Sequence, residues 1–155
     1  MLLFIQEPDK YRESFALTQL CLGDTYYDAK EYQKAEETYL QALENYRILF
    51  EESPQAYRAR LAWVQYWLMN IYAKDGFPIE QYETMLDSAL ANCEILYKSN
   101  SSYQSMIVNL RNRKGWRSLK KGQVDEALAL FESAYELDPV KSAAYLSDGY
   151  NEKAY

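Results

Sequence analysis

Apolar residues recur along the chain at the i, i+3, i+4 and i+7 spacing that marks one face of an α-helix. Breaks in this spacing fall at Lys30, at residues 75–78 and at residues 121–122. The pattern predicts an all-α fold made of helix pairs. First helices begin near residues 10, 56 and 102, second helices span about 31–51, 79–98 and 124–137, and a final amphipathic segment follows Asp138-Pro139 with Tyr145 and Leu146 on one face.

The chain repeats itself at an interval of 46 residues. Residues 8–12 reappear as residues 54–58, and a further step of 46 carries Tyr57 to Tyr103. The middle repeat carries a one-residue insertion around residues 76–78, after which the shift becomes 47. A helix pair cannot bury its apolar face alone, so the repeat predicts three stacked antiparallel pairs. A shift of 92 relates the first repeat to the third, carrying Ala35, Tyr39 and Ala42 to Ala127, Phe131 and Ala134.

This periodicity predicts one repeat domain over residues 1–155. Its units are about 8–53, 54–100 and 101–139, and residues 140–155 form a short C-terminal capping helix. A shift of 46 also relates residues 2–4 to residues 48–50. Two interpretations of residues 2–4 stay open. Either the chain begins with the end of a preceding second helix, as part of a longer array or beside a partner's unit, or these residues are a short apolar cap.

Each unit resembles the tetratricopeptide repeat. That family carries Leu-Gly and Tyr in the first helix, Ala, an aromatic residue and Ala in the second, and a closing Pro. The second repeat departs from this pattern, because Tyr82 stands where a small residue is usual. The resemblance covers about residues 8–150 and implies a right-handed α-α superhelix whose first helices line a concave groove. The matching residues are Leu22, Gly23, Tyr26, Ala35, Tyr39 and Ala42 in the first repeat and Gly115, Ala127, Phe131, Ala134 and Pro139 in the third.

The resemblance also implies which residues line the groove. Aromatic side chains there offer a large contact area at low entropic cost, and Asn can bond a peptide backbone, so the expected ligand is a peptide or a partner surface. The alternative for Trp63 and Trp116 is that they pack between repeat units. The expected lining residues are Asp24, Tyr27, Trp63, Tyr66, Asn70, Asn112, Arg113, Trp116 and Lys120.

Chaperone-binding members of the family hold a C-terminal carboxylate with a clamp of Lys, Asn and Arg side chains. Of the clamp positions, Arg113 alone carries the required residue type. Chaperone tails are therefore not the expected partner. The mismatched positions hold Leu20, Asp24, Trp67 and Asn109.

Composition narrows the function. Histidine is absent, which excludes Ser-His-Asp and Cys-His nucleophiles and His-ligated metals. Carboxylate pairs such as Glu36-Glu37 are adjacent in sequence and diverge on a helix, and no Gly-rich phosphate loop occurs. We therefore expect no catalysis, no cofactor and no metal. Cys21 and Cys93 are isolated and are interpreted as small buried hydrophobic residues in a reducing, cytoplasmic location.

Charge is distributed unevenly. The formal net charge is −6, and residues 1–52 hold 5 basic and 11 acidic side chains. A basic helix over 111–121, with Trp116 beside its charges, offers an alternative function in binding an acidic or phosphorylated ligand or nucleic acid. Overall acidity disfavours nucleic acid. Head-to-tail contact between the acidic first repeat and this helix would give a homo-oligomer. No apolar stretch is long enough for a membrane span, so no membrane partner is expected.

Overall fold

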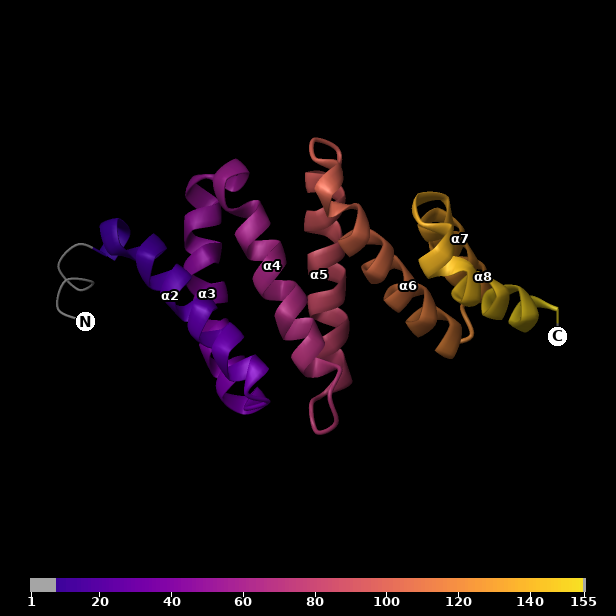
Figure 1. Cartoon of the computed structure of the whole chain (residues 1–155), viewed down its shortest axis with the longest axis horizontal. Coiled ribbons are helices and arrows are strands. Elements are labelled where there is room, and N and C mark those ends of the chain that lie inside the picture. The colour runs from indigo at the N-terminus through magenta and orange to yellow at the C-terminus, as the bar shows by residue number, and fades with distance from the viewer. Residues whose placement is uncertain (1–7, 155) are drawn as a thin grey trace. The chain divides into compact units, whose positions relative to one another are not determined.

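The structure is a computed structural model that describes residues 8–154, with side chains from residue 11 onward. It confirms the all-α prediction, since seven α-helices, one 3-10 helix and no strand occur in the described part. The segment Leu2-Leu3-Phe4 lies outside it. The helices are α2 (Pro8–Asp28), α3 (Tyr32–Glu52), α4 (Pro54–Tyr72), α5 (Ile79–Tyr97), η1 (Ser101–Tyr103), α6 (Gln104–Lys120), α7 (Val124–Leu137) and α8 (Pro139–Lys153), shown in Figure 1.

The chain divides into two compact units, Met1–Asn92 and Cys93–Tyr155, with the border inside α5. Within unit 1, α2 packs against α3 and α3 against α4. Within unit 2, α6 packs against α7, and α8 contacts both of them. Adjacent antiparallel helices therefore bury their apolar faces on one another, as the repeat predicts, and α8 covers the last pair. Whether all the repeats form a single domain stays a prediction.

Small residues let the two helices of a pair approach closely. A Cβ atom on Gly23 of α2 would lie 2.5 Å from the ring of Tyr39 in α3, and a Cβ atom on Gly115 would lie 2.5 Å from the ring of Phe131. Both aromatic side chains are fully buried. In the second repeat, Tyr82 is also buried, at 7% exposure. In the first and third repeats the Gly and aromatic residues are therefore paired across the helix crossing.

Phe131 is the centre of unit 2. It lies between Gly115 of α6 and Gly149 of α8, on which a Cβ atom would come within 3.0 Å of the Phe131 ring. Tyr145 stacks on the same ring, with centroids 5.9 Å apart. Tyr145 thus contacts the core aromatic residue while staying 37% exposed, and Leu146, expected on the same face, is half-buried. The Phe131 side chain of α7 therefore packs against both α6 and α8.

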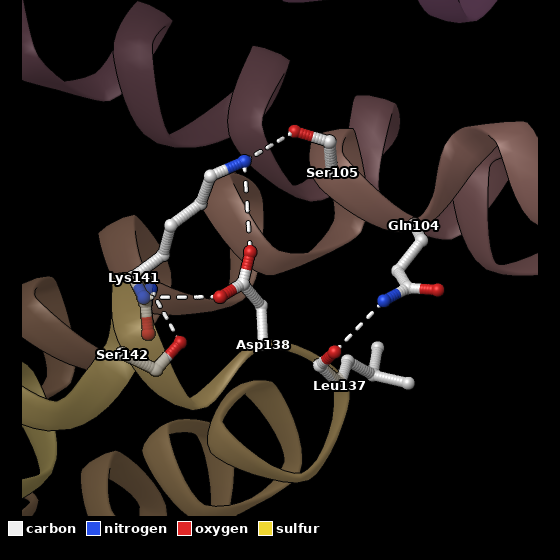
Figure 2. Close-up of polar contacts among 7 residues, drawn as sticks. Gln104, Ser105, Leu137, Asp138, Lys141 and Ser142 are labelled. Carbon is white, nitrogen blue, oxygen red and sulfur yellow. Dashed lines mark hydrogen bonds and ion pairs between the residues drawn. The ribbon is translucent and has the colours of Figure 1, made fainter.

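The turn between α7 and α8 is held by polar contacts to the start of α6, shown in Figure 2. Asp138 caps α8 by accepting a hydrogen bond from the backbone N–H of Lys141 at 3.1 Å. The Lys141 ammonium lies 3.6 Å from the other Asp138 oxygen and donates to Ser105 Oγ at 2.9 Å. Gln104 Nε2 donates to the carbonyl oxygen of Leu137 at 2.8 Å. These contacts fix where α8 begins relative to α6.

One turn position has left-handed backbone in all three repeats. Lys30, Gly76 and Gly122 are spaced by 46 residues and have φ values of 60°, 94° and 76°. After Lys30, the Glu31 N–H donates to the Tyr26 carbonyl oxygen at 2.9 Å, closing the helix end. Lys30 thus adopts a conformation that costs an L-residue roughly 1 kcal/mol, whereas glycine adopts it freely.

We expect Lys30→Gly to raise the free energy of unfolding by about 0.5–1 kcal/mol, since the relief of backbone strain exceeds the entropy that glycine adds to the unfolded chain. Urea unfolding followed by circular dichroism measures the change. Lys30→Ala is the control, and it should give no gain because alanine keeps the strain. Equal stabilisation by both variants would show that the lysine side chain, and not the backbone, is the source.

Both cysteines were expected to be buried, and this prediction holds for Cys93 and is wrong for Cys21. Cys93 is fully buried, and burial raises the pKa of its thiol to about 12, so it stays protonated at neutral pH. Cys21 instead is exposed. Its counterpart 46 residues later is Trp67, which is half-buried. Cys21 lies on the part of α2 that α3 does not cover, and periodicity alone does not reveal that difference.

Candidate functional site

Four aromatic side chains from two successive first helices gather on one surface of unit 1. Tyr27 of α2 contacts Trp67 of α4 edge to face, with ring centroids 4.8 Å apart. Trp67 also contacts Trp63 and Tyr66, each at 5.8 Å and nearly perpendicular. Trp63 and Tyr66 lie nearly parallel at 6.4 Å. We call these four residues the aromatic cluster. Each perpendicular contact stabilises the arrangement by about 0.5–1.5 kcal/mol beyond its buried area.

The helical spacing of α4 places this cluster on one face. Trp63, Tyr66, Trp67 and Asn70 follow the i, i+3, i+4, i+7 pattern. Trp63 is 38% exposed, whereas Tyr66, Trp67 and Asn70 are half-buried. Trp63 therefore does not lie in the core. It offers an accessible apolar surface, and its neighbours hold its ring in place.

Sequence reasoning placed Trp67 outside the candidate site, yet Trp67 is the central ring of the cluster. Its indole Nε1 is buried and has no hydrogen-bond partner in the described residues. An indole N–H without an acceptor costs free energy. The spacing of Trp63 and Trp67, four residues apart on one helix, was the signal that could have identified it.

Asp24, one of the predicted groove residues, makes a hydrogen bond inside the helix pair. Its carboxylate accepts a hydrogen bond from the Tyr39 hydroxyl at 2.6 Å. Burial, and then this hydrogen bond, raise the pKa of Tyr39 far above its ordinary value, so the phenol stays protonated. Asp24 thereby satisfies the one polar side-chain atom of a buried aromatic residue.

Unit 2 carries a second exposed tryptophan. Trp116 of α6 is 39% exposed, and the ammonium of Lys120 lies 5.7 Å from its ring centroid. Arg113 is half-buried on the same helix. Arg111 is turned to the interior of the unit, where Nη1 donates to the Ser133 carbonyl oxygen at 3.2 Å and Nη2 lies 3.4 Å from Glu94. Within the basic helix, Arg111 therefore packs inside the unit, whereas Lys120 is exposed to solvent.

Asn112 lies in the interior of unit 2 rather than on its surface. Its side chain is 3% exposed, and Nδ2 donates to Ser142 Oγ of α8 at 3.0 Å. Its Oδ1 has no hydrogen-bond partner within the described part of the chain. Packing of α8 on α6 explains this burial, since the sequence predicted a capping helix but not that the helix covers Asn112. Asn112 is accordingly omitted from the proposed surface below.

The predicted residues therefore fall into two groups. Tyr27, Trp63, Tyr66 and Asn70 lie together in unit 1, and Trp116, Lys120 and Arg113 share α6 in unit 2. No group of three or more Cys, Asp or Glu residues that could hold a metal ion occurs among residues 8–154. Within the same range, no helix is long and apolar enough to cross a membrane.

Comparison with curated proteins gave no match. A family model described as the tetratricopeptide repeat matches residues 21–47 and residues 108–141. The first segment contains Gly23 and Tyr39, and the second contains Gly115 and Phe131, the residues that pair across the helix crossings. These two segments identify tetratricopeptide repeats within the chain.

Proposed function

We propose that the chain is an interaction module that binds a peptide or a partner surface through the aromatic cluster of unit 1. Tetratricopeptide repeats generally mediate protein–protein interactions and are generally non-catalytic. The observation that carries the proposal is the contact of Tyr27 with Trp67, which joins aromatic side chains of two successive first helices, with Trp63 38% exposed beside them.

The chemistry of this surface suits a peptide. Tryptophan and tyrosine dominate the binding energy of many interfaces, because they bury large areas while losing little conformational entropy. Asn70 lies one helical turn beyond Tyr66 and Trp67 and offers both a donor and an acceptor to a peptide backbone. The ligand expected here carries at least one large apolar side chain to cover Trp63.

A second candidate function rests on unit 2. The exposed Trp116 with Lys120 above its ring would suit an acidic or phosphorylated ligand, held by Arg113 and Lys120. The salt dependence of the binding affinity distinguishes the two functions. Binding dominated by phosphate contacts weakens steeply with ionic strength, whereas binding anchored by aromatic side chains weakens little.

Trp63 and Trp116 form a matched pair for the test, since they are the same residue type at 38% and 39% exposure in different units. Peptides selected on the intact chain from a random display library would be measured by calorimetry against both alanine variants. Trp63→Ala should weaken binding about 30-fold, the loss of a central interface residue, and Trp116→Ala should leave it unchanged. Loss with Trp116→Ala alone, together with steep salt dependence, would favour the second candidate. If neither substitution changes the affinity, both proposals fail.

A further inference from the structure

One face of α4 packs against α3. Five residues of α4 lie on it, at the spacing i, i+4, i+7, i+11, i+14. The Tyr57 ring lies 6.5 Å from that of Tyr46 in α3, which identifies α3 as the covering helix. The opposite side of α4 meets α5, where Gln65 accepts a hydrogen bond from Asn92. The face comprises Tyr57, half-buried, with Leu61 at 5% exposure and Val64, Leu68 and Ile71 at 0%.

The same face of α2 is exposed at four of its five positions. Subtracting the repeat length of 46 gives Tyr11, Phe15, Thr18, Leu22 and Thr25. α2 meets α3 by another side, where Gly23 lies under the Tyr39 ring and Arg12 donates to Asn45. Phe15 is 38% exposed and Leu22 is 40% exposed, and Thr18 and Thr25 are exposed as well. We call these last four residues the outer face of α2.

The hydroxyl groups of the two threonines already donate hydrogen bonds within α2, so apolar groups can pack over them. Thr18 Oγ1 donates to the Ser14 carbonyl oxygen at 2.8 Å, and Thr25 Oγ1 donates to the Cys21 carbonyl oxygen at 3.0 Å. Because each hydroxyl donor is satisfied inside the helix, a partner that excludes water from this face leaves neither donor unpaired. The outer face therefore behaves as an apolar surface despite its threonines.

An acidic rim borders this face. An open hollow beside α2 is lined by Phe15 and, from α3, by Leu40, Glu37 and Glu44 among others. Phe15 and Leu40, which are 38% and 42% exposed, give this hollow an apolar lining, and Glu37 and Glu44 add two carboxylates. The first third of the chain is acidic overall, with 11 acidic and 5 basic side chains in residues 1–52. A cationic partner would meet complementary charge here.

We propose that the outer face of α2 docks an amphipathic helix of another protein, with large apolar residues at i, i+3 and i+6 and Lys or Arg on the side that meets Glu37 and Glu44. The repeat itself supplies the template, since the element on the equivalent face of α4 is a helix, α3, whose buried residues include Leu43, Tyr46 and Leu49. The proposal is independent of the aromatic cluster, which occupies a different face.

Residues 2–4 correspond by register to only one end of the covering helix. Their counterparts are residues 48–50, and the Phe50 ring meets Arg58 of α4 at 4.9 Å. Arg58 corresponds to Arg12, at the start of the described side chains of α2. Thr18, Leu22 and Thr25 correspond to the part of α4 that the earlier turns of α3 meet in an antiparallel pair. By register, residues 2–4 therefore do not correspond to the residues of α3 that meet this part of α4.

The probe is a peptide with the sequence of α3, Tyr32–Glu52, in which Glu36, Glu37, Glu44 and Glu51 are changed to Lys. The unchanged peptide is the charge control, with the same apolar residues and a formal charge of −3 from 2 basic and 5 acidic side chains. Calorimetry on the full chain should show binding of the basic peptide about tenfold tighter than that of the control, and the difference should shrink in high salt. Amide shifts in a nitrogen-15 spectrum should centre on residues 15–25.

Leu22→Glu and Leu17→Glu form the matched pair of variants, because both leucines lie on α2 with 40% and 41% exposure and only Leu22 belongs to the outer face. Leu22→Glu should weaken the basic peptide at least tenfold, and Leu17→Glu should have little effect. Circular dichroism verifies that both variants are folded.

Several outcomes would overturn the proposal. One is no binding by the basic peptide, including the case in which binding appears only after residues 1–7 are removed, which would assign the face to that segment. Another is a concentration-dependent dimer of the free chain that Leu22→Glu dissociates, which would assign the face to a second copy. Equal effects of the two leucine variants, or amide shifts centred on α4, would show that the peptide binds elsewhere.

Discussion

Gly115→Val is expected to lower the free energy of unfolding of unit 2 by about 3 kcal/mol. A Cβ atom at this position would lie 2.5 Å from the Phe131 ring, and valine adds two further methyl groups. The ring cannot move aside, because Phe131 is fully buried and Gly149 of α8 closes its other side. Valine is slightly more favourable than glycine inside a helix, so the loss must come from the clash.

Thermal and urea unfolding measure this loss, with Ala129→Val as the control for adding valine on an exposed face of α7. The cause is tested by combining Gly115→Ala with Phe131→Leu, which removes the ring that the new Cβ atom meets. The double variant should lose about 1 kcal/mol less than the sum of the two single losses. Strict additivity, or a Gly115→Val protein as stable as the parent, would contradict the close crossing.

Close crossings of this kind are the part of the fold that sequence predicts best. Glycine and an aromatic residue recur together at fixed positions, Gly23 with Tyr39 and Gly115 with Phe131, because only a residue without a side chain lets the ring lie flat against the neighbouring helix. The helix ends are also predictable. A left-handed residue must close each first helix, and the 46-residue interval marks it even where Lys30 replaces glycine.

Exposure at the outermost helix is less predictable, because it depends on which neighbours are present. Cys21 and Leu22 occupy positions whose counterparts in α4 are half-buried and buried, and the amphipathic pattern is the same in both helices. Asn112 shows the opposite case. Its position in the repeat is one that lines the groove, yet Asn112 is buried because α8 packs over it and Ser142 accepts its hydrogen bond. Periodicity identifies the faces of a helix and does not tell which faces are covered.

A polar pair that recurs in the first and second repeats, both within unit 1, escaped prediction for a different reason. Arg12 Nη1 donates to Asn45 Oδ1 at 3.0 Å, and Arg58 Nη1 donates to Asn92 Oδ1 at 2.9 Å. The arginines are 46 residues apart and the asparagines 47, since the insertion at residues 76–78 lies between Arg58 and Asn92. Such a pair depends on long side chains reaching between helices, which residue spacing alone does not specify.

Asn92→Ala is expected to cost about 2–3 kcal/mol of stability in unit 1. Asn92 makes two hydrogen bonds with its side chain, accepting from Arg58 and donating from Nδ2 to Gln65 Oε1 at 2.9 Å. Gln65 is 5% exposed, so its oxygen is left without a donor where water has little access. Arg58 loses its acceptor as well, although its guanidinium still lies over the Phe50 ring. The cost is dominated by the unpaired groups rather than by the lost bonds.

Asn45→Ala is the matched variant at the same position of the first repeat. Asn45 Nδ2 donates to the carbonyl oxygen of Gln41 in its own helix, so its removal leaves no buried side-chain acceptor, and a loss of about 1 kcal/mol is expected. Urea unfolding compares the two. Adding Gln65→Leu to Asn92→Ala removes the stranded amide and should recover part of the loss, because an apolar side chain needs no partner. If Asn92→Ala costs no more than Asn45→Ala, the buried amide of Gln65 does not determine the stability of this helix contact.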